Sequence, residues 1–143
     1  MIELYEVLPI DVLEGVQLVH EQVFEGSRLK VEKLDGKPGL FLLVARVDGQ
    51  IAGFKLGYEQ EDGVFYSWLG GVHPKFQGRG IASQLMVAQH EEAKKRGYQR
   101  VRAYSQNHRK PMMIANLKHG FDIVSTFMDA KGRHKIVFEK DLV

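Results

Sequence analysis

Residues 40–72 constrain the fold most, because they hold three strand-like segments separated by two tight turns. Asp48 and Gly49 lie between the first two apolar segments, and an Asp-Gly pair in that position favours a two-residue hairpin. A second turn, at 61–63, precedes the segment 64–72, which is rich in aromatic and β-branched residues. The pattern therefore predicts a three-stranded antiparallel meander.

Further strands and helices are predicted on both sides of this meander. The apolar period becomes helical after Gly80, where Ile81, Leu85 and Ala88 form one stripe. Asp11 is the expected N-cap of an earlier helix. The predicted elements are a strand at 2–8, a helix at 12–23, a loop with one short helix at 25–39, strands at 40–47, 50–59 and 64–72, a helix at 80–96, a strand at 98–105, a helix at 111–120, and strands at 121–128 and 133–139. This order predicts an α+β fold, with a mixed, mostly antiparallel sheet of about six to seven strands and flanking helices.

Composition narrows the class of protein. A chain of 143 residues predicts a single domain over residues 1–143. No apolar run approaches the ~20 residues of a membrane helix, and the first residues carry acids where a signal peptide carries bases, which predicts a cytoplasmic protein without a membrane partner. The chain has no cysteine, which excludes disulfides, thiolate nucleophiles and cysteine-ligated metals. Its six histidines show no metal-ligand spacing, so no metal site is expected.

The formal charge is divided unevenly along the chain. Residues 1–62 carry 12 acids and 6 bases, whereas residues 63–143 carry 6 acids and 14 bases. Eight of these bases lie between Ala93 and Phe121, where there is no acid. This asymmetry suggests an anionic ligand on the C-terminal half, and two solvated faces or a nucleic-acid surface are the alternatives.

The segment 77–82, with the sequence Gln-Gly-Arg-Gly-Ile-Ala, is the sharpest chemical feature. The first turn of a helix leaves about four N–H groups unpaired and carries partial positive charge. Glycine at 78 and 80 lets an anion approach these amides, and Lys75 and Arg79 add positive charge. The segment predicts a phosphate site, and a tight turn with a helix cap is the alternative. The segment does not continue as the GxxxxGK(S/T) pattern of a nucleotide-binding P-loop. The acidic residue about 20 positions further on, which binds the ribose in a dinucleotide-binding fold, is also absent.

Two adjacent glycines, Gly70 and Gly71, interrupt the apolar strand before this loop. Such a pair predicts a bulge or a close approach of backbone, and the alternative is that the glycines end the strand. A bulge would free backbone groups with which a ligand amide could pair like an added strand.

Residues 71–82 resemble the acetyl-CoA motif of the GNAT N-acetyltransferases, Q/R-x-x-G-x-G/A after a strand that ends in V-x-P. Val72 and Pro74 match the strand end. Asn107 and the pair Gly120-Phe121 resemble the N…GF segment of the same family, and the element order matches along nearly the whole chain. The resemblance implies a GNAT-like fold with a β-bulge in the fourth strand and acetyl-CoA as co-substrate.

The resemblance also implies roles for individual residues. The amides of 78–83 would bind the CoA pyrophosphate, the backbone of 69–72 would hold pantetheine, and Gly70 or Gly71 would donate an N–H to the thioester carbonyl. The residues that it assigns to acetyl-CoA are Leu69, Gly70, Gly71, Val72, Gln77, Gly78, Arg79, Gly80, Ile81, Ala82, Ser83 and Asn107.

The catalytic assignment departs from the family pattern. Many GNAT enzymes use a tyrosine as general acid four residues before the glycine of the GF pair, and Asn116 stands there in this chain. Asn116 could hydrogen-bond the sulfur, and Tyr104 or His108 could replace the tyrosine. Tyr66 falls where the histone acetyltransferase branch has its catalytic glutamate, so that role does not transfer.

The implied reaction is direct transfer of an acetyl group to a primary amine of a small molecule or peptide. Residues 21–39 are expected to form one wall of the acceptor site. An acyl-CoA-binding module with little or no catalysis is the alternative function. A homodimer is compatible with a fold that ends in a β-hairpin arm, and no nucleic-acid partner is expected.

Overall fold

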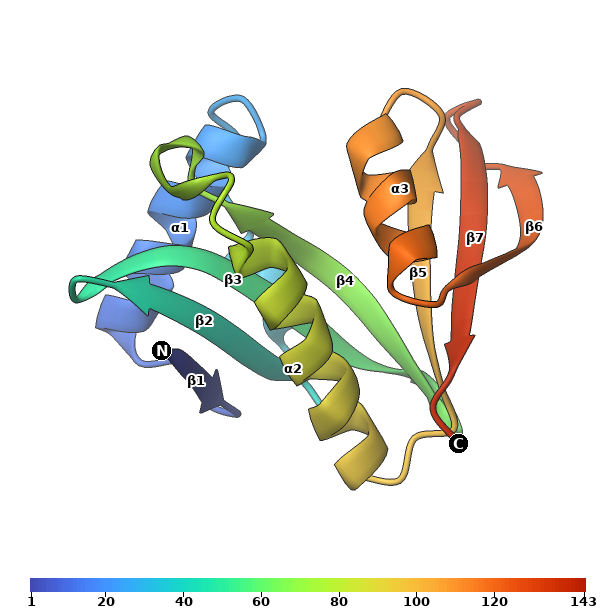
Figure 1. Cartoon of the computed structure of the whole chain (residues 1–143), viewed down its shortest axis with the longest axis horizontal. Coiled ribbons are helices and arrows are strands. Elements are labelled where there is room, and N and C mark those ends of the chain that lie inside the picture. The colour runs from blue at the N-terminus through green and yellow to red at the C-terminus, as the bar shows by residue number, and fades with distance from the viewer.

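The computed structural model describes all residues, 1–143, as three helices and a seven-stranded sheet (Figure 1). The elements are β1 (Ile2–Tyr5), α1 (Ile10–Val23), β2 (Phe41–Val47), β3 (Gln50–Glu61), β4 (Val64–Val72), α2 (Ile81–Lys95), β5 (Arg100–Gln106), α3 (Lys110–Lys118), β6 (Asp122–Met128) and β7 (His134–Asp141), with short 3-10 helices at Val31–Leu34 and Pro74–Phe76. The sheet order is β1-β2-β3-β4-β5-β7-β6, and only β4 and β5 are parallel. The predicted fold class and the predicted order of elements are confirmed.

The three helices cover the two faces of the sheet unequally. α1 packs on one face through a cluster that contains Val16, Phe54 and Leu56. α2 packs on the opposite face, where Phe65 and Leu85 belong to a larger cluster. α3 lies on the same side as α2, over β5 (Figure 1). On the face of α1, the strands β5, β7 and β6 have no helix over them.

The start of α1 differs from the expectation. Asp11 was expected as its N-cap, but the N-cap is Pro9, whose C=O accepts from the N–H of Leu13 at 2.9 Å. Asp11 lies inside the first turn, where a carboxylate interacts favourably with the helix dipole. β1 is also shorter than expected and ends at Tyr5.

The bulge in β4 is present, but the glycine pair does not form it. Leu56 pairs with Leu69 and Gly57 pairs with Ser67, so the extra residue on β4 is Trp68. The glycines pair regularly with β3. Gly71 is instead required by α1, because a Cβ atom there would lie 2.8 Å from the side chain of Val23. The expected close approach is therefore correct, and the expected position of the bulge is wrong.

β4 and β5 diverge after three paired positions. Val64–Tyr66 pair with Arg100–Arg102, and no pairing follows. Figure 1 shows the two strands side by side near the C-terminus and splayed apart toward the start of α2. The split leaves one edge of β4 free beside the glycine loop. No helix is both long and apolar enough to cross a membrane.

Candidate active site

The glycine loop adopts a conformation that favours glycine at two positions. Gly78 has a φ of +80° and Gly80 a φ of +76°. A Cβ atom at either position would meet no atom within 4 Å. The positive φ, and not steric crowding, therefore explains why glycine is found at both positions. The space in front of the two residues is open.

The loop presents a continuous run of free N–H groups. Gln84 makes the first main-chain bond of α2, from its N–H to the C=O of Gly80 at 3.0 Å. The N–H groups of residues 78–83 have no acceptor within the protein, and the N-cap residue has no capping side chain. The first turn holds no acid, and neither Lys75 nor Arg79 pairs with a carboxylate. This arrangement can bind a multiply charged anion such as a pyrophosphate.

A hollow of about 110 Å³ connects the loop to the end of β4, and its lining residues are Val72, Phe76, Gln77, Gly78, Gly80, Ile81 and Ala82. The side-chain amide of Gln77 donates to the C=O of Val72 at 3.3 Å. This bond orients the loop relative to the strand. The predicted cofactor residues of the loop and the end of β4 thus lie together.

The free edge of β4 presents alternate residues to the split. The N–H of His73 donates to the C=O of Ala52 on β3 at 2.8 Å. In an antiparallel pair the hydrogen-bonding direction alternates, so Gly71 and Leu69 also bond toward β3. Gly70 and Val72 therefore direct their N–H and C=O groups into the split. Of the two glycines proposed to donate to a thioester carbonyl, only Gly70 has the required orientation.

The end of α3 meets the start of α2 at a contact that the sequence did not indicate. The Oγ of Ser83 lies 3.0 Å from the Nε2 of His119. Asn107 is exposed just after β5, and its C=O accepts from the ammonium of Lys110. Since Ser83 and His119 are 36 residues apart, only the fold brings them together.

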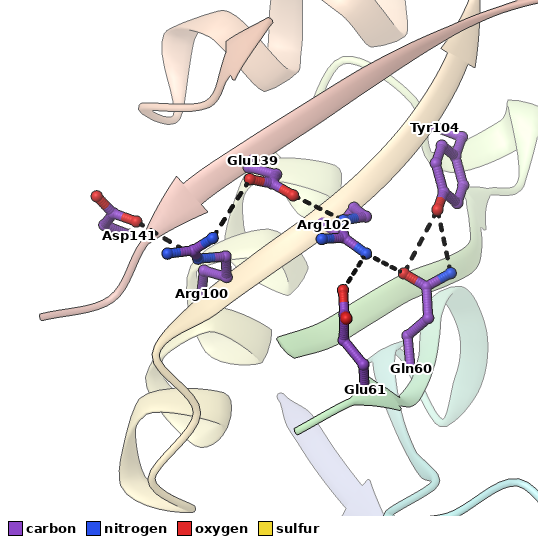
Figure 2. A network of polar contacts seen from close by, with 7 residues as sticks. All are labelled: Gln60, Glu61, Arg100, Arg102, Tyr104, Glu139 and Asp141. Carbon is purple, nitrogen blue, oxygen red and sulfur yellow. Dashed lines mark hydrogen bonds and ion pairs between the residues drawn. The ribbon is translucent and has the colours of Figure 1, made fainter. Parts of the chain in front are cut away.

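The three catalytic candidates are not brought to one point. Tyr104 lies on the uncovered face of β5, where its hydroxyl accepts from the side chain of Gln60 at 3.1 Å (Figure 2). Asn116 is buried in α3 on the other side of the sheet. His108 is exposed in the turn after β5.

An ion-pair network beside Tyr104 uses part of the basic stretch (Figure 2). Arg102 on β5 donates to Glu139 on β7 and to Glu61 on β3, both at 2.7 Å. Arg100 lies 3.8 Å from Glu139. Arg96 pairs with Glu92 at 2.7 Å. Three of the eight bases in the basic stretch are therefore paired with carboxylates.

Two bases lie on the α2 side of the sheet without a compensating acid. Lys55 pairs in register with Gly70, and its side chain would lie 3.6 Å from a Cβ atom at that glycine. Burial lowers the pKa of Lys55 to about 8. Burial, with the charges of Lys140, Lys55 and His119, lowers the pKa of His90 to about 3. The sequence signal for this site is a single lysine within the otherwise uncharged, mostly apolar stretch of residues 51–57.

Lys55→Met is expected to stabilise the protein near pH 7 by up to about 3 kcal/mol. Between the folded pKa of about 8 and the ordinary value of 10.5, the unfolded chain binds more protons at Lys55, so wild-type stability rises with pH there. The advantage of the variant should therefore be full below pH 8 and vanish above pH 10.5. Urea unfolding across this range measures it, with Lys33→Met as an exposed control. A difference that does not change with pH contradicts the desolvation of Lys55.

Comparisons with known proteins agree with this geometry. A family model described as the acetyltransferase (GNAT) family matches residues 10–121. An acetyltransferase from Pectobacterium atrosepticum is 49% identical over 55 residues, which are 38% of this chain. The match covers 37% of that protein's length, so its whole activity does not transfer directly.

Solved structures show the same fold. Ard1 from Thermoplasma volcanium has a TM-score of 0.81 at 17% identity, over 99% of this chain and 98% of its own. A GNAT family acetyltransferase from Elizabethkingia anophelis, crystallised with acetyl-CoA bound, has a TM-score of 0.69 at 18% identity, over 98% of this chain and 97% of its own. No group of three or more histidines and carboxylates that could hold a metal ion occurs in the structure.

Proposed function

Since the chain belongs to the acetyltransferase (GNAT) family, we propose that it transfers an acetyl group from acetyl-CoA to a primary amine of a small molecule or peptide. One observation carries this proposal: the free N–H groups of residues 78–83 and the free edge of β4 lie at the two ends of one hollow. A phosphate-binding loop and an open strand edge in series fit a ligand with a pyrophosphate at one point and an amide-containing arm at the next.

The loop would hold the charged part of the co-substrate. The N–H groups of 78–83 donate to the pyrophosphate, and Lys75 and Arg79 add positive charge. Ser83 would add its hydroxyl, which His119 orients from α3. Gln77 keeps the loop aligned with β4 through its bond to Val72.

The strand edge would hold the pantetheine arm. Gly70 and Val72 offer unpaired backbone groups to its amides, and Leu69 lies beside them. Asn107, which follows β5 on the other side of the split, would add a contact to the arm. The N–H of Gly70 then lies where it can stabilise negative charge on the thioester oxygen. A Cβ atom at Gly70 would be only 3.1 Å from the C=O of Phe54, so glycine suits this close packing.

The transfer requires no covalent bond to the protein. The neutral amine forms a bond to the acyl carbon, the carbon–sulfur bond breaks with its electron pair on sulfur, and the proton lost by nitrogen balances the thiolate. Asn116 has no acidic proton to give, whereas Tyr104 and His108 stay the predicted proton carriers. Tyr104 would first have to loosen its bond to Gln60.

An acyl-CoA-binding module with little catalysis is the second candidate. Two observations favour it: Asn116 occupies the family's tyrosine position, and the hydroxyl of Tyr104 already has a partner. Both candidates use the same proposed acetyl-CoA site, so binding alone does not separate the two.

Release of the CoA thiol separates them. The chain has no cysteine, so a chromogenic thiol reagent reports only CoA. We expect thiol release from acetyl-CoA that depends on both protein and amine, tested with n-butylamine, a lysine-containing peptide and a peptide with a free N-terminus. Acetyl-CoA binding without release on a wider amine panel would support the binding module, and no binding would contradict both.

The homodimer stays a prediction. β6 is an edge strand whose residues are all exposed, including Ile123, Val124 and Phe127. An exposed apolar edge is a surface on which a second copy can pair. Light scattering during size-exclusion chromatography measures the mass in solution.

A further inference from the structure

A row of aromatic side chains crosses the face of the sheet that α2 and α3 do not cover. Successive ring centroids lie 5.2–5.9 Å apart, and most pairs meet nearly edge to face. The residues are Trp68 and Tyr66 on β4, Tyr58 on β3, Tyr104 on β5 and Phe127 on β6. The row extends past the edge of α1 onto strands that carry no helix on this face.

Two rings of the row form a corner around a cation. The planes of Tyr58 and Trp68 meet at 88°, with centroids 5.4 Å apart. The ammonium of Lys37 lies 4.8 Å from the centroid of Tyr58 and 5.5 Å from that of Trp68. We call Tyr58 and Trp68 the aromatic corner. Both distances are within the range of a cation–π interaction.

The rings are the only partners of this ammonium. Lys37 forms no ion pair, and its ammonium has no hydrogen-bond acceptor, although its exposed loop holds several acids. A partly exposed cation–π contact is weak, because water screens the charge. An ammonium from a ligand can therefore displace Lys37 at little cost in free energy. The ammonium of Lys37 indicates that the corner favours this class of cation.

The aromatic corner lies next to the proposed site of acyl transfer. Trp68 is the bulged residue of β4 and lies on its free edge, which begins after Tyr66. Gly70 is two residues further on, which is about 7 Å along an extended strand. The loop that carries Lys37 is fixed to the same strands, because the C=O of Pro38 accepts from the N–H of Glu59 at 2.8 Å.

We propose that the aromatic corner binds the acceptor of the reaction as an aliphatic primary ammonium, and that Lys37 occupies it as an internal competitor. The geometry of the corner alone supports the binding of an ammonium. The identification of that ammonium as the acetyl acceptor rests on the proposed function. An uncharged amine or an alcohol would gain no cation–π energy here. After binding, the ammonium loses its proton to solvent or a protein base before nitrogen attacks the acyl carbon.

The corner carries its own probe, because Trp68 is the only tryptophan of the chain. Fluorescence is titrated with n-butylammonium chloride at pH 7, with 1-butanol as the neutral isostere. The wild type should respond to the ammonium and much less to the alcohol. Lys37→Ala should bind the ammonium about threefold tighter or better, because the competitor is gone. Lys33→Ala, in the same loop but over no ring, should match the wild type.

A second pair of variants tests the ring itself. Tyr58→Phe keeps an aromatic face and should retain ammonium binding, whereas Tyr58→Leu keeps apolar bulk and should lose it. Circular dichroism confirms that each variant is folded. Equal responses to butylammonium and butanol, no gain in Lys37→Ala, or equal binding by the two Tyr58 variants would each overturn the proposal.

The outcome is independent of acetyl-CoA. Ammonium binding at Trp68 in a protein that neither binds nor cleaves acetyl-CoA would support the ammonium site and contradict the proposed function. Amine-dependent thiol release without any ammonium response at Trp68 would support the proposed function and contradict the ammonium site.

Discussion

Gly80→Glu is expected to weaken acetyl-CoA binding by more than about 100-fold. The new carboxylate would stand among the free N–H groups of residues 78–83 and would repel the pyrophosphate that they are proposed to hold. It would also place a side chain at a φ of +76°, which L residues rarely adopt. Isothermal titration calorimetry of wild type and variant measures the effect.

Gly97→Glu is the matched control. Gly97 follows the other end of α2, has a φ of +92°, and a Cβ atom there would also meet nothing within 4 Å. The two variants therefore carry similar backbone strain and the same added charge. Gly97→Glu should bind acetyl-CoA like the wild type. Equal affinity in all three proteins would remove the glycine loop from the co-substrate site.

Gly70→Pro is expected to lower the rate of acetyl transfer by about 10²- to 10³-fold, the usual cost of losing one oxyanion donor. Proline removes the N–H that faces the split. That N–H has no partner on β3, so the ladder between β3 and β4 keeps its bonds. The rate is measured by thiol release at saturating acetyl-CoA and amine.

Gly70→Ala separates the lost donor from the added bulk. Both variants place a Cβ atom about 3.1 Å from the C=O of Phe54, but only alanine keeps the N–H. The alanine variant should therefore be much the faster of the two. Equal rates in two folded variants would show that the Gly70 N–H does not stabilise the transition state.

Much of the fold could be predicted from local signals. The Asp48-Gly49 turn has φ values of 51° and 78°, the geometry that an Asp-Gly hairpin requires. The helix after the glycine loop ends where Gly97 takes a positive φ, as its position indicated. These signals are encoded within a few residues, so no tertiary contact is needed to interpret them.

The bulge shows where local signals fail. Gly70 and Gly71 indicate that backbone is closely approached, but not by what. In the structure, Val23 of α1 packs against Gly71, and the unpaired residue is Trp68, which carries no bulge signal. The sequence could not show which helix would pack against the strand. That contact explains why glycine stands at 71, although the bulge lies elsewhere.

The site could be predicted in part for the same reason. The loop is contiguous, so its residues were found together. His119 beside Ser83, and Lys37 over Tyr58 and Trp68, join segments that are distant in the chain. Only the packed sheet places them together.

Amide chemical-shift mapping with acetyl-CoA tests the central claim most directly. The claim is that residues 78–83 and the free edge of β4 form one continuous co-substrate site. It predicts the largest shifts at the N–H groups of 78–83, together with Gly70 and Val72, and little change at Gly97. Shifts confined to other segments, or no shifts at all in the folded protein, would contradict it.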